Sequence, residues 1–337
     1  MKTNAENATQ ADSTMPAGRS NGDETETVLV GGSAVMEEIR SAILLVAKSP
    51  TPVLIGGESG TGKEVVARLI HTESNRSDKP FIAVNCGALP KEVIENELFG
   101  HEKGAFTGAL PKKAGCFELA ENGTLFFDEL AEMHPDTQVK LLRAIELKSF
   151  RRLGGNEEIH VDVRMLAATN KDIPSALKSR RLREDLYYRF SVIEIYLPPL
   201  RDRKEDVPLL VDRFLATFAR KYNKPPQEFS QEALDKLAGF DWPGNVRELK
   251  NVIERAVVIC PDVTIGSKYL PERITGRAVS RCQISIPLGT SMRDAERTII
   301  LQTLASVGGN KSHAARILGL SRRALLYKVQ QYNQTAV

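Results

Sequence analysis

The sequence lacks any long apolar run. No stretch of the 337 residues approaches the roughly 18 uninterrupted apolar residues of a membrane-spanning helix, and the N-terminus lacks the apolar run of a secretory signal. Cysteine is scarce as well: Cys86, Cys116, Cys260 and Cys282 are far apart and form no C-x-x-C pair. This spacing supports neither a zinc site nor a disulfide framework. We therefore expect a cytoplasmic protein with reduced thiols and no membrane partner.

A large net charge is also absent, but the total of +3 hides a difference between two parts of the chain. Residues 272–337 hold ten Arg or Lys against three acidic residues, so this end carries about +7 and the remainder carries −4. A compact basic unit on a mildly acidic body suggests a polyanionic partner, although a solvated basic face gives the same count. Charge alone does not decide between these two interpretations.

The order of apolar patterns predicts several domains, as the length also suggests. Residues 1–27 carry almost no large apolar side chains, so we expect a disordered tail. Over residues 28–200, short apolar runs alternate with amphipathic stretches, which indicates an α/β domain around a parallel central sheet. The predicted strands are 53–55, 81–84, 124–127 and 163–168, and two helices between them are 63–70 and 135–145.

The pattern becomes helical throughout after residue 200. A small helical subdomain of residues 201–271 is predicted to contain helices at 207–222, 230–239 and 246–259. Asn245 is the predicted N-cap of the last helix, and Glu248 falls where a capping box needs it. Residues 272–289 contain Gly, Pro, Ser and Arg without periodicity, which predicts a linker to a third unit, residues 290–337.

A glycine-rich segment follows the first predicted strand. Gly57 and Gly62-Lys63 satisfy most of the phosphate-loop pattern, in which backbone N–H groups turn inward and a helix N-terminus adds its dipole. Glu64 stands where the pattern expects the Ser or Thr hydroxyl that coordinates magnesium, so a chance Gly-rich turn stays possible on the pattern alone. The predicted nucleotide contacts from this segment are Gly57, Glu58, Ser59, Gly60, Thr61, Gly62, Lys63 and Glu64.

Polar side chains follow two later strands. Asp128 and Glu129 come directly after a buried strand, at the edge where parallel sheets bind ligands. Asp128 is predicted to hold Mg²⁺ and Glu129 to polarise the attacking water; a solvated turn is the alternative. Thr169 and Asn170 end another strand, where they can sense a γ-phosphate or orient water. The sequence thus predicts an ATP-Mg²⁺ site at this edge of the sheet.

The motifs together resemble those of one family. Residues 104–109 read Gly104-Ala105-Phe106-Thr107-Gly108-Ala109, which by themselves form a Gly-flanked turn with an exposed or buried Phe. With this segment, residues 28–333 resemble the sigma-54-dependent transcriptional activators, the bacterial enhancer-binding branch of the AAA+ ATPases. The resemblance implies an AAA+ domain followed by a lid, and it implies that residues 104–109 contact sigma-54.

The resemblance also assigns roles that the residues alone leave open. Glu64 is usual in this family's phosphate loop, and Asn85 is expected to restrain Glu129 as a switch. Arg183 and Arg189 match arginine fingers that reach a neighbouring subunit's γ-phosphate, whereas on the residues alone ion pairs with Glu184 or Asp185 are equally suitable. Arg247 matches the lid's sensor arginine. A homo-oligomer, the family's hexameric ring, is implied.

The basic end of the chain has a helix-turn-helix pattern. Ala314, Ala315, Ile317 and Leu318 form a predicted packed face, Gly319 permits a turn, and Ser321 can cap a second helix that begins with Arg322 and Arg323. A helical hairpin with a solvated basic face is the alternative. The predicted DNA-binding residues are Lys311, Ser321, Arg322, Arg323, Tyr327 and Lys328.

This unit resembles the family's Fis-type domain, with a departure. Relatives commonly read Thr-Leu-Tyr-Arg-Lys after the paired arginines, whereas this chain reads Ala324-Leu325-Leu326-Tyr327-Lys328. Loss of a hydroxyl and a guanidinium removes two possible DNA contacts, so the operator sequence does not carry over. Residues 291–305 resemble the helix that pairs two such domains.

The expected function is that of an ATP-hydrolysing activator that binds enhancer DNA and remodels the sigma-54 RNA polymerase holoenzyme. Only a polar tail precedes Val28, so no regulatory domain is expected and control is assigned to expression, to a partner in trans or to a domain absent from this chain. Two other hypotheses stay open: a DNA-binding regulator that uses ATP only to assemble, and a remodeller of some other protein.

Overall fold

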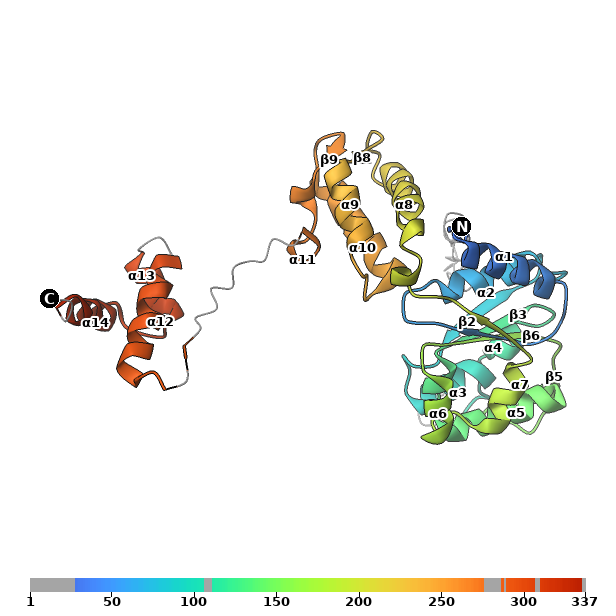
Figure 1. Ribbon diagram of the computed structural model, residues 1–337. Coiled ribbons are helices and arrows are strands. Elements are labelled where there is room, and N and C mark those ends of the chain that lie inside the picture. Colours follow the sequence, from blue (N-terminus) through green and yellow to red (C-terminus); the bar gives the residue numbers. More distant parts are fainter. Residues whose placement is uncertain (1–27, 106–110, 276–285, 288, 307–309, 335–337) are drawn as a thin grey trace, which may run out of the picture. The chain divides into compact units, whose positions relative to one another are not determined.

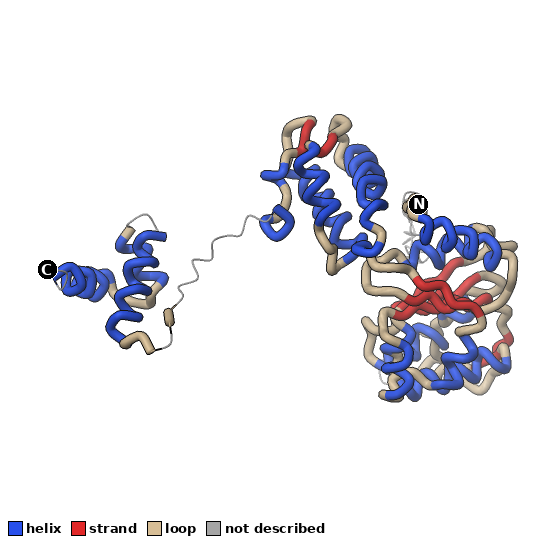
Figure 2. The backbone as a smooth tube through the Cα atoms, viewed as in Figure 1, coloured by secondary structure: helices blue, strands red, loops and turns tan. Residues whose placement is uncertain are grey.

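A five-stranded parallel sheet forms the centre of the first of two units in this computed structural model (Figures 1 and 2). The structure describes residues 28–105, 111–275, 286–287, 289–306 and 310–334. The strand order is β2-β3-β6-β1-β7. The strands are β1 (Val53–Gly56), β2 (Phe81–Asn85), β3 (Thr124–Asp128), β6 (Arg164–Thr169) and β7 (Ile193–Tyr196). Four of them confirm the sequence prediction; the edge strand β7 was not predicted.

Helices cover both faces of the sheet because successive strand residues point to opposite sides. In β3, Phe126 packs with α1 (Ala34–Ala47) and α2 (Lys63–Thr72). Its neighbours Leu125 and Phe127 pack on the other face. The helices on that second face are α3 (Lys91–Phe99), α4 (Cys116–Leu119), α5 (Pro135–Leu147), α6 (Ile173–Lys178) and α7 (Glu184–Phe190). The predicted helices 63–70 and 135–145 are thus confirmed as α2 and α5.

Short elements connect the larger ones. A two-stranded antiparallel hairpin, β4 (Ser149–Phe150) with β5 (Ile159–His160), lies between α5 and β6 in the sequence. Single 3₁₀ turns follow β3 and precede the lid: η2 (Leu130–Glu132), η3 (Leu200–Asp202) and η4 (Lys204–Asp206). Because η3 and η4 join the sheet to the next helices, they form the hinge of this unit.

The lid contains the three predicted helices, α8 (Val207–Lys221), α9 (Gln231–Gly239) and α10 (Asn245–Ile259). It is not helical throughout, because β8 (Glu228–Phe229) pairs in parallel with β9 (Thr264–Ile265), and η5 (Ser267–Tyr269) follows. The predicted Asn245 cap is wrong. Gly244 is the N-cap, and Glu248 Oε2 accepts its backbone N–H at 2.9 Å. The Asn245 side chain makes other contacts, described below.

The second unit, residues 270–337, is described separately. It contains α11 (Glu272–Thr275), α12 (Met292–Ser306), α13 (Lys311–Ile317) and α14 (Arg322–Gln334). Ile300 of α12 packs with Ala314, Ala315 and Leu325, with Leu318 beside them. The prediction for Ile317 is wrong, since its side chain is 57% exposed. Among the described residues of the chain, no helix is long and apolar enough to cross a membrane.

Candidate functional site

The glycine-rich segment forms a tight loop between β1 and α2. Gly60 and Gly62 have φ values of 80° and 108°, a region that L side chains rarely adopt. The ammonium of Lys63 donates to the carbonyls of Gly57 and Glu58 at 2.8 and 2.9 Å, so the first residue of α2 closes the loop. Burial lowers the pKa of Lys63, and the nearby carboxylates Asp128 and Glu129 oppose that shift. The loop therefore presents a buried cation at a helix N-terminus, which suits a phosphate.

The acidic pair lies at the end of β3. Asp128 Oδ1 accepts the N–H of Glu129 at 3.0 Å. Burial raises the pKa of Asp128, while Lys63 opposes that shift. Glu129 has a φ of 55°, which is uncommon for a non-glycine residue. The sequence thus placed both carboxylates correctly at the sheet edge, and both line one cavity with Lys63.

Other predicted residues end the neighbouring strands. Asn85 lies opposite Asp128 in the β2–β3 register. Its Oδ1 accepts the N–H groups of Gly87 and Ala88 at 2.9 and 3.0 Å, so a contact with Glu129 would have to use its amide nitrogen. At the end of β6, Thr169 Oγ1 accepts the N–H of Lys171 at 3.1 Å.

The side-chain oxygen of Asn170, Oδ1, is buried without a hydrogen-bond donor within the described part of the chain. Buried polar atoms are paired in nearly all structures, so such an exception calls for an explanation such as a ligand or water. Asn170 follows β6, which pairs with β3, but neither Thr169 nor Asn170 lines the cavity described next. Their predicted role as phosphate sensors stays a prediction.

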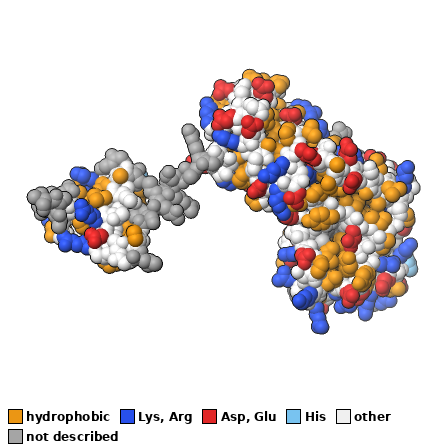
Figure 3. All heavy atoms as spheres, viewed as in Figure 1, with side chains coloured by type: hydrophobic (Ala, Val, Ile, Leu, Met, Phe, Trp, Pro, Cys, Tyr) orange, Lys and Arg blue, Asp and Glu red, His pale blue; other side chains and the backbone are white. Residues whose placement is uncertain are grey.

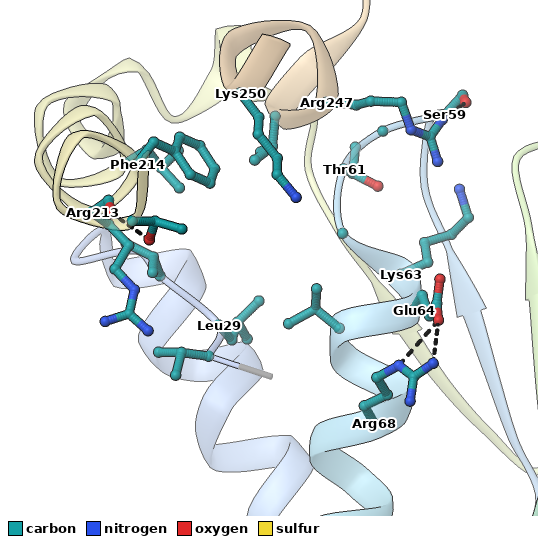
Figure 4. A pocket seen from close by; sticks show the side chains of 18 of the residues that line it. Leu29, Ser59, Thr61, Lys63, Glu64, Arg68, Arg213, Phe214, Arg247 and Lys250 are labelled. Atoms are coloured by element: carbon teal, nitrogen blue, oxygen red, sulfur yellow. Dashed lines mark hydrogen bonds and ion pairs between the residues drawn. The ribbon is translucent and has the colours of Figure 1, made fainter. Parts of the chain in front are cut away.

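A cavity of about 360 Å³ opens between the sheet edge and the lid. Ser59, Lys63 and Arg247 lie at one end of it and Leu29 and Phe214 at the other (Figure 4). The cationic glycine-rich end suits the phosphates of a nucleotide. The other end, where Leu29 and Phe214 lie with Arg213, suits the base. Sequence reasoning missed this end, because residues 28–30 and the α8 face look like ordinary core. The lining from the phosphate loop is residues 59–64.

Two predicted nucleotide contacts therefore differ from expectation. Gly57 and Glu58 do not line this cavity. Gly57 contributes its carbonyl to Lys63, as described above. The Glu58 side chain turns toward Arg201 and Asn245. The motif position alone had assigned Glu58 to the nucleotide, but its partners lie far along the sequence.

Magnesium would have few protein ligands at this site. Within the described ranges, no group of three or more His, Cys, Asp or Glu side chains is arranged to hold a metal. Mg²⁺ in nucleotide sites is usually bound by one or two carboxylates together with phosphate oxygens and waters. Asp128, whose Oδ2 has no protein partner in the described structure, fits that role.

The lid contacts the phosphate loop directly. Arg247 donates its backbone N–H to the carbonyl of Gly60 at 3.2 Å, and its Nη1 donates to Ser59 Oγ at 3.1 Å. Lys250, one turn further along α10, also lines the cavity (Figure 4). The predicted sensor position is thus next to the loop in this conformation, and Lys250 adds a cation that sequence reasoning missed.

The two candidate finger arginines do not line the cavity of their own chain. Arg183 makes a two-point ion pair with Asp185, Nε to Oδ1 at 3.1 Å and Nη2 to Oδ2 at 2.7 Å. Both side chains are more than 40% exposed. In the single chain, the ion pair allowed by the sequence is therefore present, and Arg189 lies on the same short helix, α7.

Gln138 is a functional candidate that sequence reasoning missed. It is fully buried in α5, and its Oε1 accepts the backbone N–H of Arg183 at 2.9 Å. Its Nε2 donates to the carbonyls of Met133 and Arg181 at 2.8 and 2.7 Å. One amide thus ties the segment after the acidic pair to the segment that carries Arg183. No pattern signals this role, since a polar residue in an amphipathic helix normally faces water.

The segment 104–109 lies only partly within the described residues. Gly104 and Ala105 are described, whereas Phe106, Thr107, Gly108 and Ala109 lie outside. Its base is held by Arg152, which donates Nη1 to Glu102 at 2.7 Å and Nε to Glu118 at 2.9 Å. Sequence reasoning missed Arg152 as well, because its two partners lie on either side of a distant loop.

The predicted DNA-binding residues fall into two groups. Arg322, Arg323 and Lys311 are exposed, and no ion pair involves them in the described structure; Tyr327 is 67% exposed. Figure 3 shows Lys and Arg side chains on the visible face of this unit. The other two side chains are engaged: Ser321 Oγ accepts the N–H of Ala324 as a helix cap, and Lys328 pairs with Glu296 at 2.5 Å. The predicted cap is confirmed.

Three family models match the chain in succession. The model described as the sigma-54 interaction domain matches residues 29–196, and the AAA+ ATPase lid domain matches residues 201–284. The model described as bacterial regulatory protein, Fis family, matches residues 291–332.

Similar proteins cover most of the chain. The transcriptional regulatory protein ZraR of Escherichia coli (strain K12) is 47% identical over 308 residues, which is 90% of this chain and 68% of ZraR. The response regulator protein PilR of Pseudomonas aeruginosa is 45% identical over 90% of this chain and 69% of PilR. A crystal structure of NtrX from Brucella abortus in complex with ATP has a TM-score of 0.71 at 34% identity, covering 91% of this chain and 70% of that one.

Proposed function

Because the chain belongs to the sigma-54-dependent transcriptional activators, with an AAA+ ATPase domain and a Fis-type helix-turn-helix, we propose that it hydrolyses ATP to remodel the sigma-54 RNA polymerase holoenzyme from upstream DNA. One observation supports this most: the phosphate loop, the Asp128–Glu129 pair and the lid residue Arg247 converge on one cavity.

Lys63, Asp128 and Glu129, which line the cavity, have roles in hydrolysis, as do Thr169 and Asn170 at the end of β6, which do not line it. Lys63 leaves the carbonyls of its own loop and neutralises the phosphates. Asp128 holds Mg²⁺, which supplies charge neutralisation at the phosphate oxygens when bound. Glu129 orients the attacking water and accepts its proton. The free Oδ1 of Asn170, with Thr169 beside it, reads the position of the terminal phosphate.

The site is completed by a neighbouring subunit. Arg183, the N-cap of α7, and Arg189 within this helix are exposed and do not line their own cavity, which is the arrangement that a trans-acting finger requires. Such arginines contribute about 10³ to 10⁵ in rate. We assign a ring of subunits, the family's hexamer, and in it Arg183 exchanges Asp185 for phosphate.

The result of hydrolysis is movement of residues 104–109. Asn85 lies beside Asp128 in the sheet, and its amide nitrogen is the group that can restrain Glu129. Release of this restraint moves Phe106 and Thr107, which engage sigma-54. Arg152 holds the base of the moving segment through Glu102 and Glu118.

The predicted DNA-binding domain, residues 290–337, binds double-stranded enhancer DNA. The predicted linker before it, 272–289, begins with the short helix α11. Exposed Arg322, Arg323 and Lys311 supply phosphate contacts, and Tyr327 faces outward from the recognition helix. The helix over residues 291–305 pairs two such units.

The variant Glu129→Gln tests this function against the alternative in which ATP only drives assembly. Promoter opening by sigma-54 polymerase and ATP turnover should both be lost, while ATP binding and DNA binding remain. Glu146→Gln, an exposed carboxylate on α5, is the matched control and should change neither. Promoter opening that persists without hydrolysis would refute the motor role.

The variant Thr107→Ala tests the partner. It should retain ATP turnover and lose engagement of sigma-54, measured as trapping of the complex with a transition-state analogue of ATP. Full engagement by Thr107→Ala would indicate a remodeller of some other protein.

A further inference from the structure

Three segments that are far apart in the sequence meet beside the nucleotide cavity without lining it. Glu58 comes from the phosphate loop, Arg201 from the hinge turn η3, and Asn245 from the first turn of the lid helix α10. We propose that these three residues form a junction that makes the lid and the phosphate loop move together and thereby sets the rate of nucleotide release. The inference rests on the proposed nucleotide site, to which it adds three positioning residues.

The first part of the junction is a two-point ion pair. Arg201 donates Nη1 to Glu58 Oε2 at 2.9 Å and Nη2 to Glu58 Oε1 at 2.6 Å. The hydrogen bonds from Arg201, followed by that from Asn245, hold the pKa of Glu58 below its ordinary value. Paired forks of this kind fix orientation as well as distance. The hinge is therefore tied to the side chain of the second residue of the phosphate loop.

The second part is the buried amide of Asn245. Its Oδ1 accepts the backbone N–H of Leu200 in the hinge at 2.8 Å. Its Nδ2 donates to Ser59 O at 3.0 Å and to Glu58 Oε2 at 3.1 Å. Asn245 is fully buried and has a φ of 52°, a left-handed conformation that Asn tolerates better than most residues. One side chain therefore contacts the lid helix, the hinge and the loop at once.

The backbone of the phosphate loop packs closely against the backbone at the start of the lid helix α10. A Cβ at Gly60 would lie 2.5 Å from the carbonyl oxygen of Gly244, and Arg247 N–H binds Gly60 O. Two consecutive loop carbonyls, Ser59 O and Gly60 O, are thus held from the first turn of α10. Since Ser59 and Gly60 line the cavity, a rotation of the lid shifts the groups that surround the phosphates. Lid opening and phosphate release are coupled by these contacts.

The variant Asn245→Asp is the strongest test. It keeps an acceptor for Leu200 N–H but places an oxygen against Ser59 O and the Glu58 carboxylate. Removing a buried donor and opposing like charges loosens the junction, so the Kd for ADP should rise about tenfold or more. The KM for ATP should rise in parallel, while kcat changes less than about twofold, because none of the three residues contacts the reacting atoms.

The rescue variant separates coupling from simple damage to the fold. Glu58→Gln alone keeps one acceptor oxygen, which can still serve Asn245 Nδ2 and one Arg201 nitrogen, and loses the second point of the ion pair. It should raise the Kd for ADP only about threefold. Combined with Asn245→Asp, the introduced amide can donate to the introduced carboxylate. The double variant should therefore bind ADP more tightly than Asn245→Asp alone, a non-additivity that unrelated structural losses do not produce.

A matched control lies in the same hinge. Lys204 in η4 pairs with Asp241 at 2.7 Å and donates to Gly239 O, but it contacts no phosphate-loop residue. Asp241→Asn removes an exposed hinge ion pair of comparable length and should leave the Kd for ADP and the release rate within about twofold.

The measurements use the full chain with ADP in calorimetry and a fluorescent N-methylanthraniloyl-ADP in stopped-flow release. Faster release in Asn245→Asp with recovery in the double variant supports the junction. Release equal to that of the unaltered protein in both single variants, or a double variant no tighter than Asn245→Asp, overturns it. An unaltered protein that binds no ADP would instead refute the proposed nucleotide site on which the junction rests.

Discussion

Two cations beside the phosphate loop are held very differently from two arginines of the C-terminal helix-turn-helix. In the ATPase unit, Lys63 and Arg203 are over 90% buried and donate to carbonyl oxygens of the phosphate loop itself. In the C-terminal unit, Arg322 and Arg323 are exposed and no described residue lies within ion-pair distance of them. The first arrangement fixes charges where a reaction needs them. The second leaves charges free for a polyanion that brings its own geometry. The difference indicates chemistry in one unit and attachment in the other.

Arg183 and Arg189, at the start of α7 and within it, test this comparison most strongly. Arg183 belongs to the ATPase unit but is exposed like the C-terminal arginines. If a neighbouring subunit covers it, Arg183→Ala or Arg189→Ala should lower ATP turnover by about 10³ at saturating ATP. Turnover per subunit is measured against protein concentration. Arg143→Ala, an exposed arginine on α5, is the control and should leave turnover unchanged.

Mixed rings show whether the arginine acts in trans. Subunits with Arg183→Ala keep an intact Glu129, and subunits with Glu129→Gln keep an intact Arg183. Mixing the two inactive variants should restore part of the turnover, because some interfaces then combine both wild-type residues. Mixtures as inactive as either variant alone would show that Arg183 acts within its own subunit. An exposed arginine of the ATPase unit would then have a catalytic role without a neighbouring subunit.

The buried site should also respond to pH where the exposed arginines do not. Burial raises the pKa of Asp128, so this carboxylate takes up a proton at a higher pH than an ordinary Asp as the solution is acidified. The proton competes with Mg²⁺, so the Mg²⁺ concentration for half-maximal turnover should rise about tenfold per pH unit below that pKa. Guanidinium groups do not titrate in this range. DNA affinity at fixed salt, measured on the same samples, should stay constant.

The C-terminal arginines should follow the rules of counterion release. Each phosphate contact contributes a slope of about −0.9 in the plot of log affinity against log salt. Removal of one contact by Arg322→Ala or Arg323→Ala should therefore weaken DNA binding about fivefold at about 0.15 M salt and make the slope shallower by about 0.9. Fluorescence anisotropy with a labelled duplex at several salt concentrations measures both. An unchanged slope would mean that the exposed arginine does not contact phosphate.

A strand or helix could be predicted from the sequence wherever its burial is visible in its own order of apolar and polar residues. The buried strands β1, β3 and β6 were found because parallel strands covered on both faces are continuously apolar. The edge strand β2 is only partly buried, but its run Phe81-Ile82-Ala83-Val84 is continuously apolar as well. The edge strand β7 was missed because its residues alternate, with Ile195 buried while Glu194 and Tyr196 are exposed. An alternating run of four residues resembles a loop as much as a strand.

Site residues were predictable only where their role is local. Lys63, Asp128 and Glu129 were correctly placed because a loop or a strand end positions each of them. Asn245 was taken for a helix cap because Asn before an amphipathic helix usually is one. Its contacts with Glu58 and Ser59 span more than 180 residues, and no local pattern carries such information. Gln138 and Arg152 were missed for the same reason.

The smallest expected effect concerns Lys328, a cation of the C-terminal unit that already has an acidic partner. Unlike Arg322 and Arg323, Lys328 is held by Glu296 of α12, and this hydrogen bond raises its pKa. Lys328→Met should therefore change DNA affinity less than about twofold. Glu296→Gln releases the ammonium from its carboxylate, so affinity should rise about twofold and the salt slope should steepen. Weaker binding by Glu296→Gln would show instead that the contact between α12 and α14 orients the recognition helix. Tyr332 would then help to hold this helix, because its hydroxyl donates to the other Glu296 oxygen at 2.9 Å.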